Sequence, residues 1–119
     1  MRILIVDDSM AMRRILQRTL RQAGHGHHEV VEAENGKAAL ASVRSQAPDL
    51  ILCDWNMPEM SGIELLQTLR AQGYAIPFGF VTSESTEEMR QLALGAGARF
   101  FLCKPFTPED LAQALCGIS

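Results

Sequence analysis

Charged and hydroxyl side chains stand directly after four short apolar runs of this chain. They are Asp7 and Asp8 after residues 3–6, Asp54 after 50–53, Thr82 after 78–81, and Lys104 after 100–103. A short apolar run bounded by turn signals predicts a buried strand, and in an open parallel sheet the ligand site lies just outside the carboxyl ends of the strands. We therefore expect three carboxylates, one hydroxyl and one ammonium group to converge at one end of one sheet.

The three carboxylates would repel one another there, which favours binding of a divalent cation. Mg²⁺ takes oxygen ligands in octahedral geometry and keeps several waters, so Asp7, Asp8 and Asp54 suit it. Mn²⁺ is an alternative ion for the same oxygen donors. The backbone carbonyl of Asn56 is a candidate fourth ligand.

Lys104 and Thr82 offer an ammonium group and a hydroxyl, which together with a metal ion describe a pocket that stabilises a phosphoryl group during transfer. No serine, cysteine or histidine is placed to attack that group, whereas a carboxylate can do so and form an aspartyl phosphate. Asp54 is the best candidate nucleophile because it stands between the metal ligands and Lys104. The bond from Lys104 to Pro105 is a candidate for the cis isomer, which would aim the lysine over this end of the sheet.

Strand and helix signals alternate along the chain. The expected strands cover 2–7, 29–33, 50–54, 77–82 and 99–103, and the expected helices cover 9–23, the segment between Gly36 and Pro48, 62–71, 86–94, and a last helix from Thr107 almost to the end. Five strands separated by helices predict parallel pairing with right-handed crossovers. The strands over 2–7, 50–54 and 77–82 are nearly all apolar, as interior strands are, whereas 29–33 carries two glutamates and is expected at an edge. Gly79 weakens its strand and leaves room for a close neighbour.

Chain length, net charge and the length of the apolar stretches exclude several classes of protein. A length of 119 residues favours one domain over 1–119. The net charge of −3 and the lack of a basic run argue against direct nucleic-acid binding. No apolar stretch approaches the roughly 20 residues of a membrane helix, and the first residues are not expected to act as a signal peptide, because their apolar run ends in two aspartates.

The three cysteines are expected to be small buried hydrophobes in a reducing compartment, which places the protein in the cytoplasm. The segment 25–28, His-Gly-His-His, is interpreted as a mobile surface loop. As a metal site it lacks a fixed scaffold and nearby partners.

Four segments carry a resemblance to a known family. They are Val6-Asp7-Asp8-Ser9, the nine residues from Asp54 to Gly62 (DWNMPEMSG), Val81-Thr82-Ser83-Glu84, and Cys103-Lys104-Pro105-Phe106-Thr107. Their order and spacing resemble the receiver domains of two-component response regulators, and among them the single-domain chemotaxis regulators.

The resemblance implies a flavodoxin-like α/β fold, with sheet order 2-1-3-4-5 and helices on both faces. It implies Mg²⁺ at Asp7, Asp8, Asp54 and the Asn56 carbonyl. It also implies phosphorylation of Asp54 by a histidine kinase or a histidine phosphotransfer protein, with Thr82 and Lys104 contacting the phosphoryl group.

The resemblance further implies a switch made of Thr82 and Phe101 that alters the surface of the fourth helix, fifth strand and fifth helix, where a downstream protein binds. Phe101 departs from the tyrosine that chemotaxis regulators usually carry there, so it has no hydroxyl to hydrogen-bond. Asn56 and Glu84 are expected to set the phosphate lifetime, at seconds to minutes. Such a protein is a phosphoacceptor with intrinsic autophosphorylation and autodephosphorylation chemistry rather than an enzyme, either a monomer or a phosphorylation-dependent dimer.

Other interpretations remain. The chain is alternatively a receiver from a longer response regulator or hybrid kinase, or a phosphorelay intermediate. A carboxylate-nucleophile phosphatase is disfavoured because Asn56 stands where such enzymes carry an acid and cannot protonate a leaving group. A flavin-binding flavodoxin is disfavoured because Asp7 and Asp8 would repel the flavin phosphate.

Overall fold

The computed structural model describes residues 1–84 and 86–118 and contains one five-stranded parallel sheet. The strands are β1 (Arg2–Val6), β2 (Glu29–Ala33), β3 (Leu50–Cys53), β4 (Phe78–Thr82) and β5 (Phe100–Cys103). Their order is β2-β1-β3-β4-β5, and each neighbouring pair is parallel. The predicted flavodoxin-like order is confirmed, with the glutamate-bearing strand β2 at one edge.

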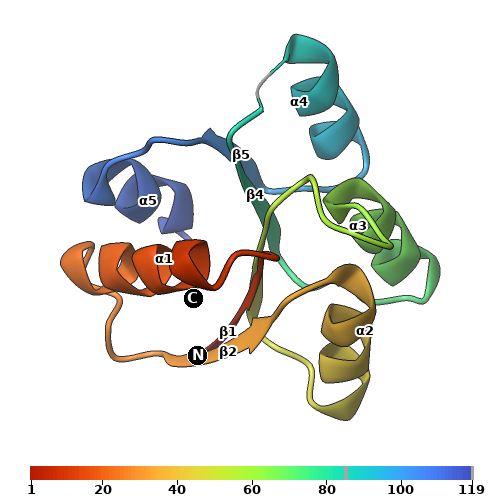
Figure 1. Ribbon diagram of the computed structural model, residues 1–119, viewed down its shortest axis with the longest axis horizontal. Helices are drawn as coiled ribbons and strands as arrows, with labels where there is room; N and C mark the ends of the chain where they lie inside the picture. Colours follow the sequence, from red (N-terminus) through yellow and green to blue (C-terminus); the bar gives the residue numbers. More distant parts are fainter. Residues whose placement is uncertain (85, 119) are drawn as a thin grey trace.

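In the described ranges, five helices cover the two faces of the sheet. They are α1 (Met10–Gln22), α2 (Gly36–Ser45), α3 (Gly62–Ala71), α4 (Glu87–Gly95) and α5 (Pro108–Leu115). Figure 1 shows α1 and α5 on one face and α2, α3 and α4 on the other. Each helix begins after a polar residue whose side chain accepts a backbone N–H of the first turn; these caps are Ser9, Asn35, Ser61, Thr86 and Thr107.

The core lies in two layers, one on each side of the sheet. Alternate residues of the interior strands point to opposite faces, so both faces must be apolar where helices cover them. Leu4, Ile51 and Phe80 pack toward α2, α3 and α4, whereas Ile5 and Leu52 pack toward α1 and α5. This two-sided burial explains why β1, β3 and β4 are continuous apolar runs. Among the described residues, no helix has the length and apolarity needed to span a lipid bilayer.

Gly79 makes room for an aromatic ring of the neighbouring strand. It lies beside Phe100 in the β4–β5 register, and a Cβ built at Gly79 would stand 2.1 Å from Cζ of the Phe100 ring. The glycine that weakens β4 locally therefore leaves the space that the end of the Phe100 ring occupies.

The cysteine prediction is correct for one residue only. Cys53 is buried in the interior strand β3, whereas Cys103 and Cys116 are exposed. Cys103 ends the edge strand β5, and Cys116 caps the C-terminus of α5, so helices do not cover either thiol.

Candidate functional site

Two aspartates are fixed by the ends of adjacent strands. Asp7 and Asp54 directly follow the paired residues Val6 and Cys53 of β1 and β3. The Asp54 N–H donates to the Val6 carbonyl at 2.9 Å, and the Asp7 N–H donates to the Ala33 carbonyl at 3.1 Å. These bonds continue the ladders of the sheet, so both backbones are held where their side chains emerge at its carboxyl end.

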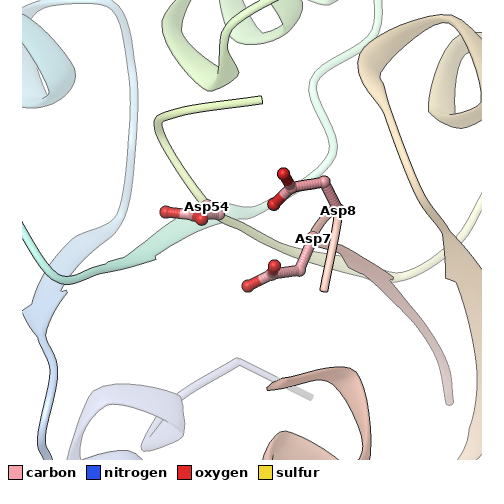
Figure 2. A group of neighbouring side chains, drawn as sticks. All are labelled: Asp7, Asp8 and Asp54. Atoms are coloured by element: carbon pink, nitrogen blue, oxygen red, sulfur yellow. The ribbon is translucent and has the colours of Figure 1, made fainter. Parts of the chain in front are cut away.

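The three predicted carboxylates converge. Asp7, Asp8 and Asp54 each offer an oxygen atom, and these atoms all lie within 4.8 Å of one another. Figure 2 shows Asp7 and Asp8 at the end of β1 beside Asp54. Asp7 is buried, Asp54 is half-buried and Asp8 is exposed, so the cluster opens to solvent on one side.

Asp7 is a nearly inaccessible carboxylate, with 1% of its surface exposed. The N–H of Ser9 donates to its Oδ1 at 2.9 Å, and Lys104 Nζ donates to its Oδ2 at 3.1 Å. Arg13 donates to the Asp7 backbone carbonyl at 2.6 Å. Both carboxylate oxygens therefore have a partner, as a buried charge requires.

Lys104 joins two of the aspartates. Its Nζ lies 3.1 Å from Asp7 Oδ2 and 3.9 Å from Asp54 Oδ2. Its backbone N–H donates to the Thr82 carbonyl at 2.8 Å, which ties it to the end of β4. The bond to Pro105 is cis, as predicted. Lys104 is thus held over the same end of the sheet from the β5 side.

The surroundings of Asp54 disfavour the charged form of its carboxyl group. Burial raises the pKa of its carboxyl group above 3.8; the positive charge of Lys104 works against this, and the negative charge of Asp7 adds to it. The Trp55 N–H donates to Oδ1 at 2.7 Å and favours the charged form. A cation placed among the three carboxylates would relieve this repulsion.

Thr82 is fully buried at the end of β4, next to the cluster. Its hydroxyl oxygen accepts the N–H of Glu84 at 3.3 Å, so it is connected to the segment that leads toward α4. Glu84 and Asn56 are both exposed. The side chain of Thr82 is thus the buried link between the cluster and the β4–α4 connection.

An aromatic group connects Asp54 to β5. The ring of Trp55 lies 4.9 Å from the ring of Phe80 and 6.1 Å from that of Phe101, and Phe80 and Phe101 are 6.0 Å apart. Phe101 is only half-buried, on the edge strand. The residue after Asp54 is therefore in aromatic contact range of the residue predicted to switch.

Comparisons with known proteins agree with this geometry. Residues 3–116 match the family model described as the response regulator receiver domain. The chain belongs to the response regulator receiver family. A chemotaxis protein CheY homolog of Campylobacter jejuni is 40% identical over 118 residues, which cover 97% of this chain and 89% of that protein. Chemotaxis protein CheY1 of Helicobacter pylori is also 40% identical, with 97% and 94% covered.

Solved structures lead to the same family. Chemotaxis protein CheY4 of Vibrio cholerae, crystallised at low pH, superimposes with a TM-score of 0.85 at 37% identity, and the match covers 99% of this chain and 98% of that one. This receiver domain thus shares its fold and more than a third of its residues with chemotaxis proteins.

The receiver domain brings together five of the predicted site residues: Asp7, Asp8, Asp54, Thr82 and Lys104. The Asn56 carbonyl as a metal ligand stays a prediction, as do the roles of Glu84 and Phe101.

Sequence reasoning missed the positioning role of Gly62. A Cβ there would stand 2.2 Å from the Asp54 carbonyl oxygen, and the Gly62 N–H donates to the Trp55 carbonyl at 2.8 Å. Glycine in the first turn of a helix is unfavourable by itself, and that was the available signal of a close approach. No sequence pattern indicated the contact of Arg13 with the Asp7 carbonyl, because several arginines lie along α1.

Proposed function

We propose that this receiver domain, residues 1–119, accepts a phosphoryl group on Asp54 in a Mg²⁺-dependent reaction and so controls binding of a downstream protein. The observation that supports it most is the convergence of Asp7, Asp8 and Asp54 with Lys104 spanning two of them. The buried Asp7 and the partly buried Asp54 and Lys104 weaken the fold unless a ligand uses their charges. Membership of the response regulator receiver family supports the same function.

The donor set suits a hard cation. Asp7, Asp8, Asp54 and the backbone carbonyl of Asn56 would hold Mg²⁺, or Mn²⁺ in its place, since all of these donors are oxygens. When bound, the ion supplies positive charge that offsets the carboxylates and the oxygens of the phosphoryl group. Asp7 is already fixed by Ser9 and Lys104, so little reorganisation is needed.

In the transfer step, a carboxylate oxygen of Asp54 attacks phosphorus of a phosphohistidine. A P–O bond forms, the P–N bond breaks, and its electron pair stays on the imidazole nitrogen of the donor, which takes up a proton. With acetyl phosphate the bond that breaks is P–O, and acetate leaves. Lys104 and Thr82 contact the phosphoryl oxygens, which accumulate charge during transfer.

The output passes from Thr82 to β5. When the Thr82 hydroxyl turns toward the new phosphoryl oxygens, it gives up its place next to Glu84 N–H, and Phe101 turns inward to fill the space. What supports this is the burial of Thr82 and the half-buried position of Phe101. The altered surface comprises α4, β5 and α5, where Leu92 and Leu94 are 50% and 38% exposed.

The phosphoryl group is expected to persist for seconds to minutes. Asn56 and Glu84 are both exposed beside the site and shape the path of the attacking water. Phosphorylated protein that stays intact overnight in Mg²⁺ buffer would contradict this lifetime.

The proposed partners are a histidine kinase or histidine phosphotransfer protein as donor and one downstream protein as target, in the cytoplasm, with no direct contact to nucleic acid. The free protein is a monomer, or forms a dimer only when phosphorylated. The similarity to chemotaxis proteins favours a chemotaxis-type target.

Trp55 provides the test, because it is the only tryptophan and directly follows Asp54. Its fluorescence would be followed while Mg²⁺ is titrated in, then after addition of acetyl phosphate or beryllofluoride, in the wild type and in Asp54→Asn. We expect a Mg²⁺-dependent change, then a phosphodonor response that is missing in Asp54→Asn.

A folded wild-type protein that responds to neither addition would overturn the proposal. A phosphodonor response of equal size in Asp54→Asn would remove Asp54 as the acceptor. Mass spectrometry of the acetyl phosphate reaction would then locate the modified residue.

A further inference from the structure

Three histidines gather in the connection from α1 to β2, at the end of the sheet opposite the acidic cluster. The rings of His27 and His28 lie 3.9 Å apart, and those of His25 and His28 lie 5.3 Å apart. Figure 1 shows this connection entering β2 beside the N-terminus. The sequence predicts a mobile surface loop here; in the structure the three histidine rings lie close to one another.

Both ends of the segment are tied to regular structure. The His25 N–H donates to the Leu20 carbonyl of α1 at 2.8 Å, and Gly24 turns the chain there with φ of 87°. His28 directly precedes β2, whose first residue, Glu29, donates its N–H to the Met1 carbonyl at 3.1 Å. The backbones of His25 and His28 are therefore held by a helix end and a strand start.

Two imidazole nitrogens already stand at a distance suited to chelation. His25 Nδ1 and His28 Nε2 are 3.1 Å apart. Two histidine nitrogens bound to one tetrahedral Zn²⁺ lie about 3.3 Å apart, because each Zn–N bond is about 2.0–2.1 Å. In the metal-free protein one hydrogen lies between the two nitrogens, and an ion can take its place only when that hydrogen moves to the other nitrogen of its ring. On His28 the other nitrogen, Nδ1, lies 3.1 Å from the Met1 amino group, which must turn away when an ion binds.

The surroundings permit an ion to enter. His25 and His28 line a surface pocket of about 280 Å³ together with Leu20, Arg21 and Gly26.

We infer that His25 and His28 form a binding site for a divalent transition-metal ion such as Zn²⁺ or Ni²⁺. The exposed ring of His27 lies 3.9 Å from the His28 ring, and water would fill the coordination positions that the two imidazoles leave open. Imidazole donors select such ions over Mg²⁺, which prefers oxygen. The site is separate from the acidic cluster and does not depend on the proposed phosphorylation.

Isothermal titration of the full chain with Zn²⁺ tests the site, with excess Mg²⁺ present to occupy the acidic cluster. We expect one Zn²⁺ per chain in the wild type, and an affinity at least about tenfold lower in His25→Gln and in His28→Gln. Asp54→Asn is the control, because it alters the acidic cluster and should leave the Zn²⁺ affinity unchanged. The histidine ring resonances in NMR spectra should shift with Zn²⁺ in the wild type.

Other outcomes would overturn the inference. One is a wild type that binds no Zn²⁺. Another is an equal affinity in the two histidine variants, which circular dichroism must show to be folded. A Zn²⁺ affinity that falls in Asp54→Asn and persists in His25→Gln would assign the ion to the acidic cluster instead.

Discussion

Asp54 carries its negative charge at a cost to the cation-free protein. Its side chain is 14% exposed, and burial raises the pKa of its carboxyl group above 3.8. A raised pKa means that the folded state binds the proton more tightly than the unfolded state. This contribution favours folding at acid pH and is lost as the pH rises from near 3.8 through the raised value.

Replacing Asp54 by asparagine should therefore stabilise the cation-free domain at neutral pH by roughly 1 kcal/mol. The gain over wild type should shrink as the pH falls through the same window, because the wild-type carboxyl group then becomes neutral as well. Urea unfolding of both proteins with chelator at several pH values measures this difference. An asparagine variant less stable than wild type at neutral pH would show that the ion pair with Lys104 outweighs the cost of burial.

Lys104 compensates the most buried charge of the site. Without its ammonium group, Asp7 Oδ2 loses a partner at 3.1 Å while 1% of the residue is exposed. Lys104→Met should lower the free energy of unfolding by about 2 kcal/mol without Mg²⁺, and by less with saturating Mg²⁺, which supplies a substitute charge. Thermal unfolding with and without the ion measures both values.

The only other lysine supplies a matched control. Lys37 is exposed in the first turn of α2, and Lys37→Met should change the stability by less than about 0.5 kcal/mol. An equal loss for Lys104→Met in the presence and absence of Mg²⁺ would argue that the ion does not interact with Asp7.

At the level of elements, β4 packs against β5 in this way because residue 79 is a glycine and has no side chain. Gly79→Ala places a methyl group 2.1 Å from the Phe100 ring, which must then leave the sheet surface. We expect a loss of about 2 kcal/mol in the free energy of unfolding, measured with urea. In a Phe100→Ala background the same alanine should cost much less, since the conflicting ring is gone.

Gly95→Ala is the control for this pair of strands. Gly95 ends α4 and has open space where a Cβ would stand, so alanine there should be neutral or stabilising. An equal cost for Gly79→Ala with and without Phe100 would mean that the ring is not the obstacle.

For the whole molecule, binding of an ion at this one site, the acidic cluster, should raise the free energy of unfolding of the entire domain. Any ligand that binds only the folded state raises its stability, by about 2.7 kcal/mol at one hundred times the dissociation constant. The melting temperature should therefore rise with the logarithm of Mg²⁺ concentration, and less so in Asp8→Asn, which removes the exposed carboxylate of the cluster. A melting temperature that is indifferent to Mg²⁺ would contradict the proposed metal site.

Much of this molecule was predictable from local sequence signals. Apolar runs ending in Asp7 and Asp54 gave interior strands with polar residues at their carboxyl ends, because burial on both faces requires continuous apolar residues. Ser9 and Thr107 marked helix starts, because their side chains satisfy free N–H groups. The residues of the acidic cluster followed from those two kinds of signal.

The features that could not be predicted from the sequence depend on strand register and on which strands lie at the edges of the sheet. The partner of Gly79 follows from the pairing of β4 with β5, which no local pattern specifies. The apolar run around Cys103 predicts a buried thiol, but β5 lies at the edge of the sheet and Cys103 ends that strand, so the thiol is exposed. The contact between His25 and His28 depends on how the loop folds back toward β2.

The unequal exposure of the three thiols makes the protein suited to site-selective labelling. Burial and the nearby charges of Asp54 and Asp7 raise the pKa of the Cys53 thiol, so it stays protonated and unreactive toward alkylating reagents. In a Cys116→Ser variant, a maleimide fluorophore would therefore attach to Cys103 alone. That dye would lie on the strand that we propose contacts the downstream protein, so its emission could report complex formation directly.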